Sequence, residues 1–122
     1  MENKIHKNKI TAGSVIFAKN KVNVGEITGG AVVICLGPIK VREQITGGAI
    51  VISNTRIEAD EVAQACAIIA APDVEIYGNN YTKAVSVEQA LNSSRFKERM
   101  ELSSDLNVTN INNLKELFRR LQ

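Results

Sequence analysis

The sequence has few aromatic residues, few cysteines and no long hydrophobic run, and each shortage excludes a class of protein. It contains three Phe, two Tyr and no Trp among 122 residues, yet 44% of the chain is hydrophobic. Ile, Val, Ala and Leu therefore supply most of the apolar content, and β-branched residues favour strands. This length and composition predict one core and exclude disorder over the whole chain.

Membrane and nucleic-acid classes are also disfavoured. No apolar run approaches the roughly 18 residues of a membrane-spanning helix, and the charged first residues are not followed by the apolar region of a signal peptide. We therefore expect no membrane span and a cytoplasmic location. A net charge of +2 is too small to indicate nucleic acid. Residues 1–9, with three Lys and one Glu, are expected to form a flexible basic segment.

Few residues are available for catalysis or metal binding. Cys35 and Cys66, the only cysteines, are expected to be buried, reduced thiols. The only histidine, His6, precedes the repeat described below. We predict no catalytic residue, no cofactor and no metal site.

One motif occurs four times at intervals of 17 or 18 residues. Residues 27–34 (ITGGAVVI) and 45–52 (ITGGAIVI) are nearly identical, and residues 10–16 (ITAGSVI) and 62–69 (VAQACAII) are weaker copies. A second motif, two apolar residues separated by one residue, follows the same series at Val22/Val24, Ile39/Val41, Ile57/Ala59 and Val74/Ile76. The extra residue of the second coil lies within residues 42–44.

This period suits one turn of a parallel β-solenoid, in which equivalent positions of successive coils stack about 4.8 Å apart. We predict a mainly β fold: a short right-handed β-helix of about four 17–18-residue coils over residues 10–81, then a helical tail over residues 82–122. The repeat itself does not determine handedness. Small residues at the fourth and fifth positions predict a tight corner. One inward column is expected to be Ile10, Ile27, Ile45 and Val62.

The first strand of each coil is apolar on both sides, whereas the second strand has the polar outer column Asn23, Lys40, Glu58 and Glu75. An outer apolar stripe of this size indicates a partner surface. Either the chain's own C-terminal helices or a second copy can cover it, and we prefer a second copy, giving a homodimer or higher homo-oligomer. The expected self-association face is Val15, Phe17, Val32, Ile34, Ile50, Ile52 and Ile69.

The tail is expected to be helical. Ser86 to Gln89 reads as a capping box, with Ala90, Leu91 and Phe96 on one side of the following helix. A second, amphipathic helix is predicted over residues 110–122. Docking onto the solenoid or capping its last coil is the preferred role, and recruitment of a partner or a membrane surface is the alternative. The apolar face of this helix is Ile111, Leu114, Leu117, Phe118 and Leu121.

The coil sequence resembles the C-terminal β-helix domain of the septum-site inhibitor MinC, and is similar to the solenoids of bactofilins and flagellar-assembly-protein-A-like proteins. The matching stretches are residues 11–18 (TAGSVIFA) and 22–41 (VNVGEITGGAVVICLGPIKV), and the resemblance covers roughly residues 10–78. It implies dimerisation or polymerisation through solenoid faces and ends. Where the MinC domain docks to a membrane-associated ATPase through Arg-Ser-Gly-Gln, this chain has Thr-Ala-Gly-Ser at residues 11–14.

The expected function is a non-enzymatic, self-associating scaffold or adaptor, for which the resemblance implies a process in bacterial cell division or the cytoskeleton. Another protein is the alternative partner. A different class remains open, a carbohydrate-active or acyl-transferring β-helix enzyme. Its candidate acids would be Glu58 and Glu75, for which a solvated ladder relieved by Lys40 is the preferred interpretation.

Overall fold

The computed structural model describes residues 2–11, 13–63, 67–78, 84–102 and 111–121. Within these ranges, strands precede helices along the chain. The strands are β1 (Glu2–Ile10), β2 (Val15–Ile27), β3 (Val32–Cys35), β4 (Ile39–Ile45), β5 (Ile50–Ser53), β6 (Arg56–Val62), β7 (Ile68–Ala70) and β8 (Asp73–Ile76). The helices are α1 (Val87–Asn92), α2 (Ser94–Leu102) and α3 (Ile111–Leu121).

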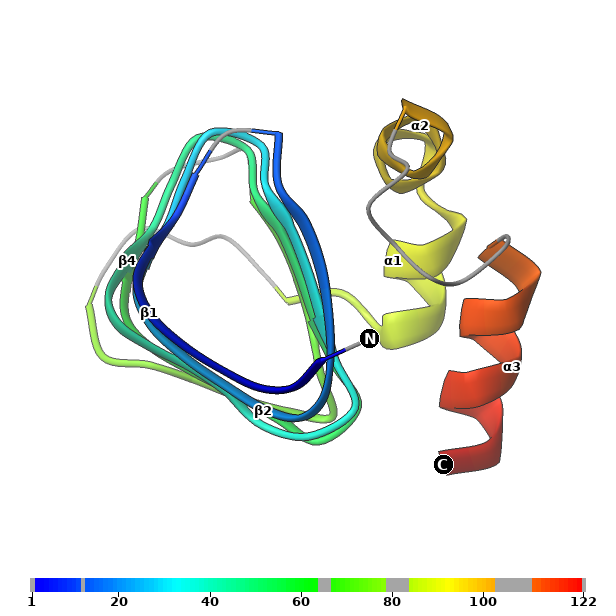
Figure 1. Cartoon of the computed structure of the whole chain (residues 1–122), viewed down its shortest axis with the longest axis horizontal. Coiled ribbons are helices and arrows are strands. Elements are labelled where there is room, and N and C mark those ends of the chain that lie inside the picture. Colours follow the sequence, from blue (N-terminus) through cyan, green and yellow to red (C-terminus); the bar gives the residue numbers. More distant parts are fainter. Residues whose placement is uncertain (1, 12, 64–66, 79–83, 103–110, 122) are drawn as a thin grey trace.

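The strands wind into a solenoid whose coils stack on one another. Along the sheet the strand order is β7-β5-β3-β2-β4-β6-β8, with β1 also paired to β2, and all of these pairs are parallel. Viewed along the stack, the coils superpose as a rounded triangle with the helices along one side (Figure 1). The predicted β-solenoid of about four coils with a C-terminal helical part is confirmed.

The strand register follows the sequence repeat. Val22 lies beside Ile39, and Ile39 lies beside Ile57. On β4 the segment from Val41 to Gln44 is one residue longer than the matching segments of both neighbouring strands. This bulge falls within the residues where the sequence predicts the extra residue, and it lets the columns on either side of it stay aligned.

The register of the fourth coil differs from the prediction by one residue. Ile68 lies beside Ile50, and Ile69 lies beside Val51. The sequence repeat predicts Ile69 on the outer face. In the structure, the Ile69 side chain packs in the interior of the solenoid and Ile69 is 2% exposed. The error arises because both candidates are isoleucine, so hydrophobicity cannot distinguish the two registers. The fourth copy also lacks the Gly-Gly pair that marks the corner in the second and third copies.

The N-terminal segment is a strand rather than a flexible extension. β1 pairs with β2 over most of its length, so the solenoid begins at least as early as Glu2 and the predicted boundary at residue 10 is wrong. Ile5 and Ile10 are 3% and 2% exposed and pack into the core, while the lysines between them are exposed. The Lys and Asn residues of this segment indicate a solvated extension. The structure shows instead that the two inward-facing isoleucines pack against the core and that the segment pairs with the next coil.

The interior of the triangle is filled by stacked aliphatic columns. Ile27, Ile45, Val33 and Val51 have no exposed surface, and the small Ala49 fills a position near the corner. Burial of each large aliphatic side chain contributes ~1.5–3 kcal/mol, and each column adds one such side chain per coil. The core therefore runs the length of the solenoid as one cluster.

Glycine pairs form a corner within the first motif of the second and third copies. Gly29, Gly30, Gly47 and Gly48 all have φ between 61° and 77°, in the left-handed region. A Cβ on Gly47 would lie 2.5 Å from the backbone nitrogen of Gly29 in the coil beside it. The repeated Gly-Gly pair is therefore needed both for its backbone conformation and for the close approach of successive coils.

Replacing Gly47 with Ala should lower the free energy of unfolding by about 3 kcal/mol, because a left-handed backbone and a collision with Gly29 both oppose the new methyl group. Gly13→Ala is the matched control. Gly13 has φ of 79°, but nothing lies within 4 Å of its added Cβ, so only ~1–2 kcal/mol is expected. Urea denaturation of both variants measures the difference, and equal losses would refute the role of close coil contact.

Candidate interaction surfaces

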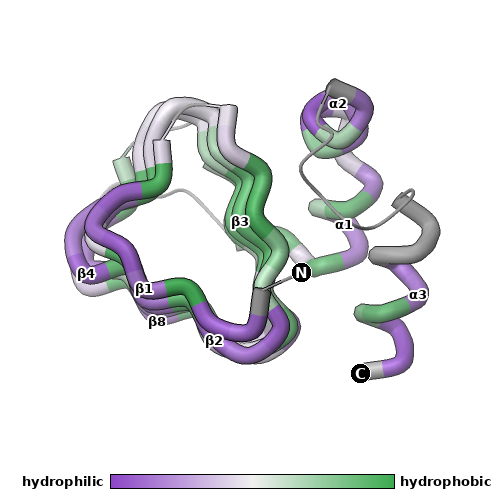
Figure 2. The backbone as a smooth tube through the Cα atoms, in the orientation of Figure 1, coloured by the Kyte–Doolittle hydropathy of each residue, from purple (hydrophilic) through white to green (hydrophobic). Residues whose placement is uncertain are grey.

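The outer apolar stripe predicted from the sequence lies on β2, β3 and β5, and the chain's own helices bury it. Phe17 is 4% exposed and Ile34 has no exposed surface. The preferred prediction, that a second copy covers this face, is therefore wrong, and the alternative of intramolecular cover holds. Figure 2 shows hydrophobic residues along the side that carries β3, facing the helices. The strand members of this buried cluster include Val15, Phe17, Val32, Ile34, Ile50 and Ile52, and its helical members include Val87, Ala90, Leu91, Phe96 and Phe118.

Helix α1 is placed against this face by two local features. Val85 forms a parallel bridge with Ala70, and its N–H donates to the Ile69 carbonyl oxygen at 2.9 Å. The predicted capping box follows: the Gln89 N–H donates to the Ser86 Oγ at 3.1 Å, and the Ser86 N–H donates to the Gln89 side-chain oxygen at 3.0 Å. The chain therefore enters the helix from a strand-like position on the sheet, which fixes the face that the helix buries.

Ser93 joins α1 to α2 and redirects the chain. Its N–H and its hydroxyl both donate to the Ala90 carbonyl oxygen, at 3.2 and 2.9 Å. Its hydroxyl oxygen also accepts from the Phe96 N–H at 3.1 Å. One side chain thus closes the first helix and caps the second. The turn brings the Phe96 ring, which is 0% exposed, onto the apolar face.

Two arginines of α2 lie over the glycine corner. The Arg95 guanidinium donates to the Gly48 carbonyl oxygen, and the Arg99 guanidinium lies 3.8 Å from the position a Cβ on Gly30 would take. A shallow pocket of about 180 Å³ lies here and is also lined by Glu98. Because these arginines contact the corner itself and an acid lies beside them, we interpret them as fastening α2 to the solenoid.

Helix α3 completes the cover. Phe118 is 1% exposed and Leu117 is half-buried, and both contact the apolar cluster. Docking of this helix onto the solenoid side of the molecule therefore agrees with the preferred role of the predicted amphipathic helix. For Ile111, Leu114 and Leu121 the structure describes the helical backbone but not the side chains.

Replacing Phe96 with Ala should destabilise the fold by about 3–5 kcal/mol, because it removes a fully buried ring from between α2 and the sheet. The neighbouring Lys97→Ala is the control; Lys97 is exposed, so its loss should change the free energy of unfolding by less than ~0.5 kcal/mol. Denaturant unfolding of both variants measures the effect. If Phe96→Ala were as mild as its control, the helices would not be a fixed part of the fold.

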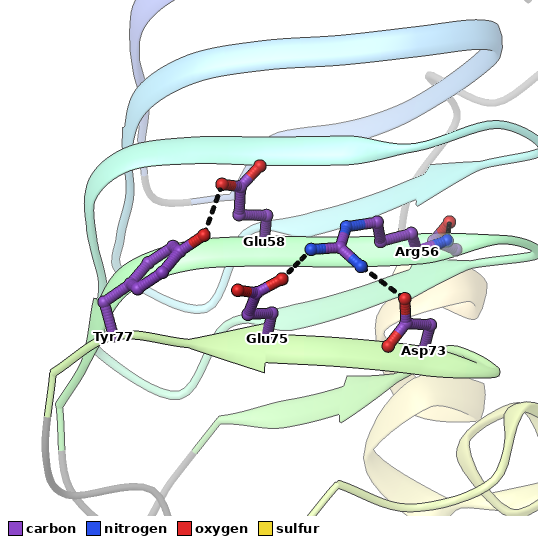
Figure 3. Close-up of polar contacts among 6 residues, drawn as sticks. Arg56, Glu58, Asp73, Glu75 and Tyr77 are labelled. Atoms are coloured by element: carbon purple, nitrogen blue, oxygen red, sulfur yellow. Dashed lines mark hydrogen bonds and ion pairs between the residues drawn. The ribbon is translucent and has the colours of Figure 1, made fainter.

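The opposite, polar side carries a network of ion pairs between coils. Arg56 of β6 forms ion pairs with both Asp73 and Glu75 of β8, and the Tyr77 hydroxyl donates to a Glu58 carboxylate oxygen at 2.9 Å. Figure 3 shows these side chains along neighbouring strands. This hydrogen bond raises the pKa of Tyr77. Of the stacked acids Glu58 and Glu75, Glu75 pairs with Arg56 and Glu58 accepts from Tyr77. Lys40 lies beside Glu58 on the neighbouring strand, as the repeat predicts.

The charge of the polar side changes sign along the solenoid. β1 carries three Lys and one Glu, and β2 carries two Lys and one Glu. β6 carries three acids and one Arg, and β8 carries two acids and no base. Since the strands of this side pair in the order β1-β2-β4-β6-β8, one end of this side is basic and the other is acidic. The small net charge conceals this separation.

Both ends of the polar side leave a strand edge unpaired among the described residues. β1 pairs only with β2, and β8 pairs only with β6. On the other side of the triangle, β7 is partly covered, because Val85 bridges to Ala70. An unpaired edge presents backbone N–H and C=O groups that can pair with another strand.

Cys35 is a buried thiol that stays protonated at neutral pH. Its side chain has no exposed surface, and it is a free thiol. Burial raises the pKa of the thiol to about 11, against a smaller lowering by a backbone hydrogen bond from Gly37. A reactive cysteine needs an accessible thiolate. Cys66, the other expected buried thiol, lies outside the described residues.

The raised pKa of Cys35 predicts a loss of stability in alkali. Its ordinary pKa is 9.0, so between pH ~9 and ~11 the folded state keeps a proton that the unfolded state releases, and the free energy of unfolding falls. The contribution is complete below pH ~9 and declines by ~1.4 kcal/mol per pH unit above it. The stability advantage of the wild type over Cys35→Ala should therefore shrink by about 2 kcal/mol by pH ~11. Urea denaturation across this range measures it, and a constant difference would contradict the shift.

Within the described ranges, no group of three or more His, Cys, Asp or Glu side chains could hold a metal ion. None of the helices there is long and apolar enough to cross a membrane. Comparison with protein-family models, curated proteins and solved structures found no match to the chain.

Proposed function

We propose that the protein is a non-enzymatic scaffold that self-associates through the ends of its solenoid. The observation that carries this proposal is the pair of strand edges, on β1 and β8, that no described strand covers. β1 is nine residues long, and long open edges are uncommon in proteins that remain monomeric. A second solenoid is a natural partner because it offers strands of matching direction and spacing.

The burial of the apolar face supports the ends as the site of association. That face packs against the chain's own helices, and within the described residues Tyr77 is the large hydrophobic side chain that remains exposed, at 60%. An association driven by an apolar patch would need such a patch at the surface. Pairing between backbone groups at a strand edge needs no apolar patch, because backbone hydrogen bonds do not depend on the side chains.

The location and process that we propose are the cytoplasm and bacterial cell division or the cytoskeleton. A cytoplasmic location is supported by the buried free thiol of Cys35, because reducing compartments maintain thiols. The process is supported by the resemblance of residues 10–78 to polymer-forming solenoids. The enzyme alternative gains no support, since the carboxylates of Glu58 and Glu75 are occupied by Tyr77 and Arg56.

Self-association is tested by measuring the mass of the purified chain over a wide range of concentrations, by light scattering and sedimentation velocity at low salt. The weight-average mass should rise continuously with concentration, as expected for association through two ends. Arg119→Glu, on the exposed surface of α3, is the control and should not alter the rise. A constant monomer mass at every concentration would refute the proposal.

A further inference from the structure

We propose that the two ends of the solenoid bind each other head to tail, so that β1 of one copy pairs in parallel with β8 of the next. This inference rests on the proposed self-association and specifies its partner surface, its register and its direction. The occupant of each open edge is the opposite end of a second copy of this chain. Repetition of the contact gives a filament with a direction, because a heterologous contact of this kind does not close on itself.

Charge complementarity selects opposite ends rather than like ends. Lys4, Lys7 and Lys9 of β1 are exposed, and so is Asp73 of β8, while 43% of the Glu75 side chain is exposed. A head-to-tail contact brings the basic strand against the acidic strand. A contact between two β1 strands would bring lysines against lysines, and like charges on facing strands are unfavourable. The sign change along the solenoid therefore favours one of the possible end contacts.

The columns of the solenoid define the register. Ile5 begins a column that runs through Val22, Ile39 and Ile57 to Val74. Continuing this column into a second copy places Ile5 beside Val74, apolar on apolar. Val74 is only partly buried in the single chain, so the contact covers the end of the core. The same register places the cationic Lys4 beside Asp73.

The adjacent column places the next residues of the two strands together. It runs from His6 through Asn23, Lys40 and Glu58 to Glu75. In the proposed contact His6 of one copy lies beside Glu75 of the other. Their Cα atoms would then be separated by the ordinary spacing of neighbouring strands, ~4.8 Å.

The two end layers are also complementary in shape. At the acidic end, Val85 occupies the layer beyond Ala70 on the helix-covered side, while the position beyond β8 has no described strand. At the basic end, β1 occupies the polar side of its layer and reaches Ala18 of β2. On the helix-covered side of that layer, no described strand pairs with Val15 to Phe17 of β2. Head-to-tail stacking therefore puts β1 of one copy and the Val85 bridge of the other into one shared layer, on different sides of the triangle.

Disulfide crosslinking between single-cysteine variants tests direction and register together. Cys66→Ala supplies the background, since Cys35 is buried, and His6→Cys and Glu75→Cys are made on it separately. The stacked Cα spacing of ~4.8 Å lies within disulfide reach. Under mild oxidation a mixture of the two variants should give a crosslinked dimer as the main product, and either variant alone should stay largely uncrosslinked. Lys40→Cys mixed with His6→Cys is the control; Lys40 shares the column but lies inside the sheet, so it should not crosslink.

Each alternative outcome has a distinct meaning when it is read with the mass measurement. Crosslinks formed mainly by either variant alone would show contact between like ends and would overturn the direction while leaving self-association intact. A rising mass without crosslinks in the mixture would overturn the proposed register in the same way. A constant monomer mass without crosslinks would overturn this inference and the proposed function together.

Discussion

The structure depends on the parallel pairing of each coil with the next, which forces every column to hold compatible side chains. A side chain that fits the interior in one coil must fit again about 4.8 Å further along, so Ile27 and Ile45 stack and so do Val33 and Val51. The same spacing demands glycine at the corners, where the backbone of one coil lies against the Cα of the next. A coil with an extra residue must release it outward, as β4 does in its bulge.

One side of the triangle is apolar on both its inner and its outer face, and the helices cover the outer face. The inner face of β3 and β5 belongs to the solenoid core, and the outer face needs a second layer to exclude water. Val85, Ser86 and Ser93 set the path of the chain so that Phe96 reaches this layer. Because the covering helices belong to the same chain, the apolar face is part of the fold and is not available to a partner.

The polar side differs from the apolar side because its charged side chains are divided unequally between the two ends of the solenoid. Arg56 joins the last two strands through ion pairs with Asp73 and Glu75, and such exposed pairs contribute little stability individually. Their arrangement matters more than their number. Bases gather toward β1 and acids toward β8, so the solenoid has a direction that its nearly symmetrical coils do not show. Among the described residues, this direction is accompanied by two open strand edges, on β1 and β8, which are the basis of the proposed scaffold function.

The sequence by itself determined the coil: its length, its inward columns, its glycine corner and its bulge all follow from two motifs that recur together every 17 or 18 residues. It also determined the capping box and the apolar side of the tail at Ala90, Leu91, Phe96 and Phe118. Only the tertiary structure decided what covers the outer stripe, because a helix of the same chain and a second copy bury apolar surface equally well and the sequence pattern does not distinguish them. It likewise decided that residues 2–9 join the sheet and that Ile69 rather than Ile68 points inward. Both features depend on which backbone groups pair between neighbouring coils. The hydrophobic pattern determines the register of a strand when one of its faces is polar, and it does not when both faces are apolar.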